Sequence, residues 1–595
     1  MTSAHAATGI EPEAALDAAL ADVDAPGPVG PDGPPADGTG RRIAELDAAE
    51  AFPAAFVERL DAFGLPAYYV PAEWGGTGTD HELLLRLWRT VARHDLSTMT
   101  AHGKTYLGAA SVWIAGNAEQ ATTTASAVLA GAPVAWALSE PDHGADLLNG
   151  SLTATRQDGG YRLDGVKWPI NNATRARYLT VLARTGAAGT GRGQSLFLVD
   201  KTMLAPGTWR ALPKEPTQGI RGIDISGIAF EGAVLRSGAL LGGEGTGVET
   251  VLRALQLTRT MCAALSLGAG EHALRIAAMF AAERIVQRRP LLDRAFPRAI
   301  LGRCAALMAA VEAAALVGSR SIHGLTGEMS VVSAVVKSVA PELTDSVIAE
   351  LAELLGARSF LTGVYAHGSF QKIWRDHQIV SVFDGSTPVN RAALVQQFPR
   401  LVREYTAGTV DEDGLAKAAS AGDPPSPLDR GALSLLSRRG CSVVQSIPAL
   451  AASLATGTAP DGLAAHAVAL QAAAAEVHEL MAAVAPAARP PMAAYETAAA
   501  YELCFAAAAC LHAWSAGRHR HDGEPLWEDG LWVRAALRAL RARLATTLRT
   551  PAPAAAPGDD RIDDLLAQHV ARAARTGAPV TPFGTPMPRP RDGRS

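Results

Sequence analysis

The chain has 595 residues, of which 48% are apolar and 5% aromatic, and its formal net charge is −5. This length exceeds what one hydrophobic core normally serves, so several domains are expected, and the apolar content excludes a chain that is disordered throughout. The slight acidity and the lack of a dense basic run argue against a nucleic-acid-binding protein, so no nucleic-acid partner is expected.

The N-terminal residues show no basic region followed by an apolar run, so no secretory signal is predicted. The five cysteines lack metal-ligand spacing, which argues against a metal site. They are expected to be reduced, small apolar side chains in a cytoplasmic protein.

Residues 1–40 are rich in Ala, Pro, Gly and Asp without a sustained period, which predicts a disordered N-terminus. A helical domain is predicted over 41–133. Over 134–240, apolar and polar residues alternate, as from Tyr161 to Leu163, and this alternation favours β-strands. The prediction is therefore a β domain that follows a helical one.

After a glycine-rich turn at 242–247 the helical period returns, since Val248, Val251 and Leu255 share one helix face. Several further helices are predicted up to residue 407, and they suffice for an antiparallel four-helix bundle over 241–407. The predicted fold class is thus α+β, mostly α.

Three segments are predicted beyond the bundle: a linker over 408–430, an accessory helical domain over 431–550, and a mobile tail over 551–595 whose pattern allows one short helix near 560–575. The accessory domain ends in an arginine-rich helix over 531–548. A bundle helix with solvated arginines is the favoured interpretation of that helix. Contact with an anionic membrane or a carrier protein is the alternative.

Four motifs occur in order between about residues 41 and 407, and a catalytic-type segment follows the last of them. The first is Gly64-Leu65 followed by Val70-Pro71 and Glu73-Trp74-Gly75-Gly76. The second is Trp136-Ala137-Leu138-Ser139-Glu140-Pro141-Asp142-His143-Gly144-Ala145-Asp146, and the third is Gly165-Val166-Lys167-Trp168-Pro169-Ile170-Asn171-Asn172-Ala173. The fourth comprises Thr258-Arg259, Glu283-Arg284 and Glu353-Leu354-Leu355-Gly356, and it is followed by Arg375-Asp376 and Phe383-Asp384-Gly385-Ser386. Together they resemble the acyl-CoA dehydrogenase family. The resemblance implies FAD as the cofactor and an architecture of helical domain, β-barrel-like domain and four-helix bundle.

By this resemblance, Asp384 stands where the family carries a Glu that removes the α-proton of an acyl thioester. Its backbone N–H would meet the developing enolate oxygen. Asp is one methylene shorter, which withdraws the carboxylate by roughly 1.5 Å, and a misplacement of about 1 Å can cost ~10²-fold in rate. Some members carry the base at the position of Thr258, but a Thr hydroxyl cannot replace a carboxylate.

The resemblance also implies the binding residues. The cofactor positions are Trp136, Leu138, Ser139, Trp168, Asn171, Arg284, Glu353, Gly356 and Ser386. The substrate positions are Ala145, Arg259, Phe383 and Gly385. Arg284 would reach the FAD diphosphate of a neighbouring subunit, so a homodimer or homotetramer is expected.

Several of these positions depart from the family pattern. Pro169 occupies the position of the family's stacking Trp, with Trp168 displaced by one, and Asn171 stands in place of a Thr. Ala145 replaces a Ser, and Glu353 replaces a Gln, so one hydrogen bond near the thioester chain and the contacts to the adenosine half of FAD are expected to differ.

The predicted function is the FAD-dependent α,β-dehydrogenation of an acyl thioester carried on CoA or on an acyl carrier protein. An electron-transfer flavoprotein or another acceptor would take the electrons. Two alternatives stay open. One is a flavin-dependent oxidase or monooxygenase, because the nitroalkane oxidases of the same superfamily use Asp at the position of Asp384. The other is a catalytically weakened flavoprotein that serves as an assembly partner.

Overall fold

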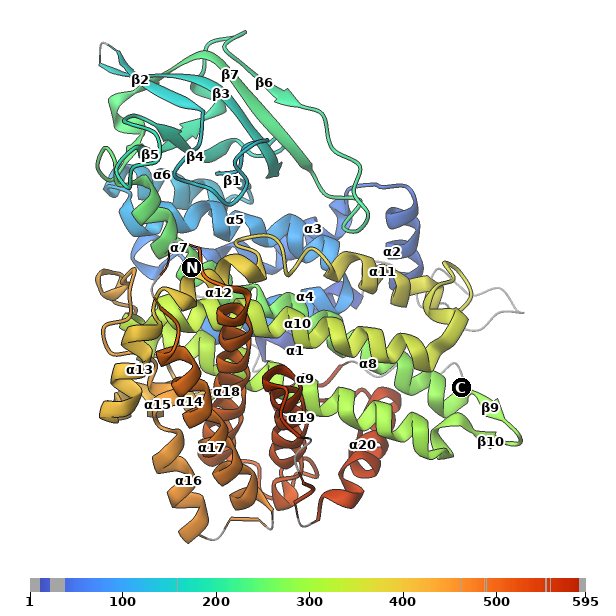
Figure 1. The fold of residues 1–595 in the computed structure, drawn as a ribbon. Helices are drawn as coiled ribbons and strands as arrows, with labels where there is room; N and C mark the ends of the chain where they lie inside the picture. The colour runs from blue at the N-terminus through green and yellow to red at the C-terminus, as the bar shows by residue number, and fades with distance from the viewer. Residues whose placement is uncertain are drawn as a thin grey trace, which may run out of the picture. The chain divides into compact units, whose positions relative to one another are not determined.

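The structure is a computed structural model that describes residues 11–21, 38–157, 159–457, 459–460, 462–485, 487, 489–551, 554–556 and 558–587. The chain divides into two compact units (Figure 1). Unit 1 contains residues 45–79 and 95–258, and unit 2 contains 80–94 and 259–595 together with 5–44. Helix α2 (Gly38–Ala48) and helix α7 (Gly247–Met261) each cross from one unit to the other.

Unit 1 combines three helices with one sheet. Its helices are α3 (Ala54–Phe63), α5 (Leu96–Ala115) and α6 (Ala118–Leu129). Two of these have side-chain caps that satisfy the first backbone N–H groups: Asp95 accepts from Thr98 N at α5, and Asn117 and Gln120 form a capping box at α6. The caps explain where these helices begin.

The sheet of unit 1 has eight strands. They are β1 (Val134–Ala137), β2 (Thr153–Gln157), β3 (Gly160–Asn171), β4 (Tyr178–Arg184), β5 (Gln194–Asp200), β6 (Trp209–Leu212), β7 (Ile225–Arg236) and β8 (Leu240–Leu241). Their order is β6-β7-β3-β2-β4-β5-β8, and β1 pairs in parallel with β4. Strands β2 and β3 pair antiparallel and form a hairpin.

The register of β3 against β7 shifts between Lys167 and Ile170. Pro169 lies inside this break, is exposed, and has no N–H with which to continue the ladder. The irregular strand end therefore carries the part of the third motif that departs from the family pattern.

Unit 2 is helical apart from a short hairpin of β9 (Ile285–Val286) and β10 (Arg289–Pro290). Its bundle helices are α4 (His81–His94), α8 (Ala263–Glu283), α9 (Ala295–Gly324), α10 (Met329–Leu355), α11 (Ser369–His377), α12 (Thr387–Val395) and α13 (Phe398–Ala407). Helix α9 is long and apolar enough to cross a membrane, but most of it is buried among α8, α10, α18, α19 and α20. It is the central helix of this unit.

Seven further helices of unit 2 follow α13 in the chain. They are α14 (Glu412–Ala419), α15 (Ser442–Gln445), α16 (Ile447–Thr456), α17 (Leu463–Ala482), α18 (Met492–Gly517), α19 (Leu531–Leu548) and α20 (Ile562–Thr576). Helix α19 is the arginine-rich helix. Trp532 and Leu537 are fully buried in it, Arg538 pairs with Asp563, and Arg541 donates to His466. This placement favours a bundle helix over a membrane-binding one, although several arginines are engaged by neighbours instead of being solvated.

The structure corrects three expectations about irregular segments. The predicted disorder over 1–40 is wrong for α1 (Pro12–Ala21), where Leu16, Asp17 and Leu20 are fully buried. The predicted linker contains α14, with Leu415 buried. The predicted mobile tail contains α20 and a segment that buries Thr581 and Phe583. In each case only a few residues form the buried contacts. The many Ala, Pro and Gly residues around them obscure the pattern in the sequence. The remaining parts of the first and last predicted segments (1–10, 22–37 and 588–595) lie outside the described residues.

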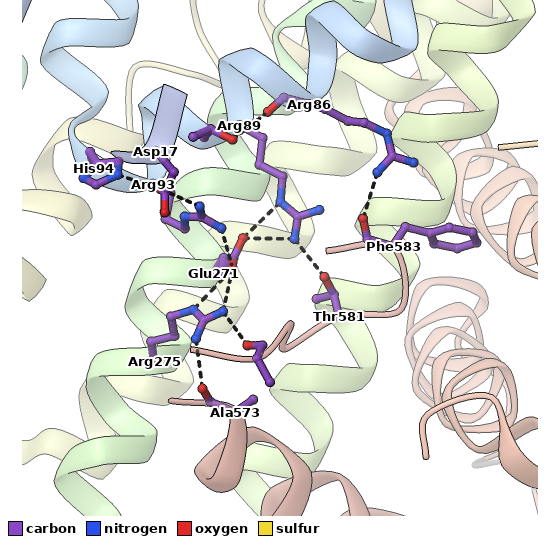
Figure 2. A network of polar contacts seen from close by, with 12 residues as sticks. Asp17, Arg86, Arg89, Arg93, His94, Glu271, Arg275, Ala573, Thr581 and Phe583 are labelled. Atoms are coloured by element: carbon purple, nitrogen blue, oxygen red, sulfur yellow. Dashed lines mark hydrogen bonds and ion pairs between the residues drawn. The ribbon is translucent and has the colours of Figure 1, made fainter. Parts of the chain in front are cut away.

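A buried network of charges joins these segments to the bundle (Figure 2). The carboxylate of Glu271 on α8 accepts from Arg89 at 3.0 Å, from Arg93 at 3.2 Å and from Arg275 at 3.1 Å. Arg93 also pairs with Asp17 of α1 at 2.7 Å. Helix α4, which carries Arg89 and Arg93, therefore groups with unit 2 although the sequence placed it in the N-terminal helical domain.

The segment after α20 enters the same network (Figure 2). Thr581 donates to Glu312 at 2.9 Å, and the backbone N–H of Phe583 donates to the same carboxylate at 3.0 Å. Arg86 donates to the carbonyl of Phe583 at 3.0 Å. Residues 578–583, called the strap below, thus supply hydrogen bonds that Glu312 needs inside the core.

Candidate active site

The predicted catalytic segment lies in unit 2, in the turn 378–386 between α11 and α12. Asp384 has a φ of 57° and Gly385 a φ of 99°, so two consecutive residues lie in the left-handed region. For a residue other than Gly this conformation is uncommon and concentrates at functional sites. A Cβ at Gly385 would stand 2.7 Å from Nη2 of Arg259, so Gly is the residue that fits there.

Three side chains hold Asp384 and its neighbours. Arg259 Nε donates to the carbonyl oxygen of Asp384 at 2.9 Å. Cys262 Sγ donates to Oδ2 of Asp384 at 3.4 Å. Asn390 Nδ2 donates to the carbonyl oxygen of Gly385 at 2.9 Å. The structure therefore brings Asp384, Gly385 and Arg259 together, as the sequence predicted.

Arg259 is 8% exposed, and burial lowers its pKa to about 10, against the opposing attraction of Asp384 and Cys262. It is still a cation at neutral pH. A buried cation beside the Asp384 backbone makes this end of the turn favourable for negative charge.

Buried hydrogen bonds connect the predicted catalytic segment to the helices of the bundle. His377 is fully buried; its Nδ1 lies 2.6 Å from Asp345 and its Nε2 lies 3.0 Å from Ser266. Lys337 of α10 donates to the carbonyl oxygen of Val380 at 2.7 Å. Because both ring nitrogens of His377 have partners, it acts as a structural clamp between α11, α10 and α8.

Unit 1 carries the second group of predicted residues. Lys167 Nζ donates to the carbonyl oxygen of Leu138 at 2.9 Å and to Glu140 at 2.8 Å, and Trp168 N donates to the carbonyl oxygen of Ser139 at 3.0 Å. Burial opposes ionisation of Glu140, but Lys167 and Ser151 lower its pKa to about 2. The Leu138–Glu140 turn is therefore held against the end of β3, which brings Ser139 next to Trp168.

Some buried polar atoms near this turn have no protein partner. Neither the amide oxygen nor the amide nitrogen of Asn171 has a hydrogen-bond partner among the residues that the structure describes. The same holds for Nε1 of Trp136. Buried polar groups are nearly always hydrogen-bonded, so such atoms indicate a place where a ligand would complete the bonding. Both residues are predicted cofactor positions.

The remaining predicted residues lie at element ends. In unit 2, Arg284 is the exposed C-cap of α8, and its guanidinium makes no hydrogen bond or ion pair within the described part of the chain. Glu353 is exposed in the last turn of α10, and Gly356 caps that helix with a φ of 58°. Ser386 is the N-cap of α12 without a side-chain cap bond. In unit 1, Ala145 is exposed on the loop after β1.

Sequence reasoning missed two residues of the site. Cys262 was expected only to be a small apolar side chain, and Lys337 was not singled out. Cys262 follows Arg259 by three residues, which is one helical turn, so the two share a face. That spacing could have indicated that Cys262 lies near the site. Lys337 is distant in the chain from the other site residues, and no sequence pattern indicated it.

Comparison with known proteins identifies the family of the sequence between residues 39 and 398. Residues 39–132, 135–233 and 245–398 match the sequence models described as the N-terminal, middle and C-terminal domains of acyl-CoA dehydrogenase. The human mitochondrial short-chain specific acyl-CoA dehydrogenase is 28% identical over 368 residues, covering 61% of this chain and 86% of the relative.

Two solved structures share the fold. An acyl-CoA dehydrogenase from Bacillus anthracis, complexed with FAD, aligns over 97% of this chain and 93% of its own with a TM-score of 0.68 and 19% identity. A prolyl acyl carrier protein oxidase aligns over 60% of this chain and 96% of its own with a TM-score of 0.55 and 16% identity. The first includes the region beyond residue 407, so the accessory helices are part of a recurring architecture. With the three domain models in chain order over most of residues 39–398, the chain belongs to the acyl-CoA dehydrogenase family of oxidoreductases.

Proposed function

We propose that this protein is an FAD-dependent dehydrogenase that desaturates an acyl thioester between Cα and Cβ, with Asp384 as the base. The observation that carries the proposal is the setting of Asp384: a carboxylate in a left-handed turn, fixed through its main chain by Arg259 and through its side chain by Cys262. A base that removes a weakly acidic proton must be held in place, because its position controls the rate.

Asp384 would take the α-proton, and its backbone N–H would donate to the thioester oxygen on which charge develops. Bound FAD would supply the hydride acceptor. Leu138, Ser139, Trp168 and Asn171 would contact the flavin ring, and the orphaned amide of Asn171 supports this assignment.

Other residues would hold the rest of the cofactor. Trp136 and Ser386 are proposed as further flavin contacts, and the free indole nitrogen of Trp136 supports this. Arg284, with Glu353 and Gly356, is assigned to the adenosine diphosphate half. The exposed guanidinium of Arg284 suits a bidentate phosphate contact. Glu353 would repel a diphosphate unless it is paired.

The substrate contacts proposed are Arg259, Phe383 and Gly385 around the base, with Ala145 beside the acyl chain. The name of the human relative supports an acyl-CoA substrate. The name of the prolyl acyl carrier protein oxidase supports a carrier-bound substrate and an oxidase as the second candidate. The short base Asp384 is the feature of this chain that favours the oxidase.

An oligomer is also proposed. The loop after α10 exposes Phe360 (82%), Val364 (63%) and Leu361 (41%), an apolar surface of the kind that subunit contacts cover. A second copy would cover this loop, and Arg284 would then reach the cofactor of that copy. An electron-transfer flavoprotein or another acceptor is the proposed oxidant of the reduced enzyme.

The test is anaerobic mixing of the holoenzyme with acyl-CoA and acyl-carrier thioesters of graded length. We expect the flavin absorbance to bleach with at least one thioester, and Asp384→Asn to abolish bleaching without loss of bound flavin. The exposed Asp293→Asn variant is the matched control. Flavin that stays oxidised with every thioester contradicts the dehydrogenase. Peroxide formed in proportion to substrate in air favours the oxidase, and unchanged bleaching in Asp384→Asn removes Asp384 as the base.

A further inference from the structure

Cys262 lies between α7 and α8 and differs from the other cysteines in what its thiol contacts. Its side chain is 2% exposed, and Sγ donates to Oδ2 of Asp384 at 3.4 Å. Cys304 donates instead to the carbonyl oxygen of Val347 at 3.9 Å, and burial raises the pKa of Cys504 to about 12. A thiol against the proposed base is therefore a specific contact and not a general property of the buried cysteines.

The groups around Asp384 contact different parts of the turn. Arg259 Nε bonds the backbone carbonyl oxygen, so it fixes the main chain. Lys337 approaches from α10 but bonds Val380 and lies 5.5 Å from the ring centroid of Phe383. From α11, His377 bonds Asp345 and Ser266, and Lys372 pairs with Asp376. Cys262 donates to the carboxylate of Asp384 itself.

The chemistry of the thiol suits a base. A hydrogen bond to an ionised carboxylate favours the charged form and so weakens the base, and a cationic donor does this most strongly. A thiol is a weak donor. It therefore restrains the carboxylate with a small loss of basicity, whereas Arg or Lys at the same place would hold it at a larger loss.

We propose that Cys262 is a positioning residue that orients the carboxylate of Asp384 for proton abstraction through its S–H···O hydrogen bond. This inference rests on the proposed role of Asp384. The thiol forms and breaks no covalent bond. It acts by restricting the side-chain torsion of Asp384, whose carboxylate must be placed accurately because the side chain is short.

The experiment compares Cys262→Ala and Cys262→Ser with Cys304→Ala, another buried cysteine in unit 2, as the control. Each holoenzyme is mixed anaerobically with the thioester that bleaches the wild type, and the bleaching rate is followed against substrate concentration. We expect Cys262→Ala to lower the limiting rate by about 10- to 100-fold with a nearly unchanged half-saturating concentration. Cys262→Ser should recover most of the rate.

A second measurement does not depend on activity. The infrared S–H stretching band of Cys262, assigned by its loss in Cys262→Ser, should shift toward that of a non-bonded thiol in Asp384→Asn and stay unchanged in Asp293→Asn. An unshifted band, or a Cys262→Ala enzyme with the wild-type bleaching rate, overturns the positioning role. If Asp384→Asn still bleaches, the proposed function fails instead, and the band still reports whether the contact exists.

Discussion

The ammonium group of Lys337 donates to the carbonyl oxygen of Val380 at 2.7 Å and lies 5.5 Å from the ring centroid of Phe383. One fully buried cation thus supports the main chain of the catalytic turn and the aromatic residue before Asp384.

Lys337→Met should therefore weaken both stability and activity. The carbonyl oxygen of Val380 would lose a buried donor, at a cost of about 1–3 kcal/mol in the free energy of unfolding. The loosened turn should lower the bleaching rate by roughly 10-fold or more. Urea denaturation and anaerobic bleaching check the two effects. A variant with the wild-type midpoint and rate would show that α10 does not support the turn.

Gly385→Ala should impair activity more than folding. The Ala would have to adopt a φ of 99°, and its Cβ would meet Nη2 of Arg259 at 2.7 Å. Relief requires Arg259 to move, which breaks its hold on the Asp384 carbonyl. We expect the bleaching rate to fall at least ~10-fold through misplacement of the base. Gly408→Ala, at a positive φ with no atom near the added Cβ, controls for backbone strain alone.

Glu271→Gln should destabilise unit 2 strongly. Its carboxylate is fully buried and accepts from Arg89, Arg93 and Arg275. Removing the charge leaves the buried Arg275 without its carboxylate partner and takes away one of the two carboxylates that Arg89 and Arg93 each contact, a loss of about 3–5 kcal/mol. Glu350→Gln, which breaks a partly exposed pair with Arg303, should cost less than about 1 kcal/mol. Equal denaturation midpoints for the two variants would contradict this account.

Glu328 should make unit 2 less stable as the pH rises from 4.5 to 7. Burial raises the pKa of Glu328 to about 7, although Ser442 donates to its carboxyl through N–H at 2.7 Å and through its hydroxyl at 2.6 Å. The ordinary value is 4.5, so within this window the folded state holds a proton that the unfolded state has released. Stability therefore falls with pH, by a total of roughly 3 kcal/mol from this group.

Glu328→Gln carries no titrating group, so its unfolding free energy should depend less steeply on pH between 4.5 and 7. Chemical denaturation at several pH values measures the slope. The Glu350→Gln variant should keep the wild-type slope. A Glu328→Gln slope that matches the wild type would assign the pH dependence to other groups.

The sequence predicted the fold class and the grouping of Asp384, Gly385 and Arg259, because those motifs are local and family-like. It could not predict the contact of Cys262 with Asp384, which depends on how α7 meets a turn 122 positions away. It also missed α1 and the burial of the strap. Asp17 of α1 pairs with Arg93 and Thr581 of the strap donates to Glu312, and these partners are distant in the chain and come together only once the bundle has formed.

The strap has a consequence for how the polypeptide reaches its final state during synthesis. Arg89 is made early, yet Thr581, which it contacts at 2.8 Å, is added 492 positions later. Until then the core around Glu312 lacks its last hydrogen-bond donors, and unit 2 remains an intermediate with incomplete internal bonding. Long chains expose such intermediates to aggregation. On the ribosome, this protein would therefore need protection until its last helices have emerged.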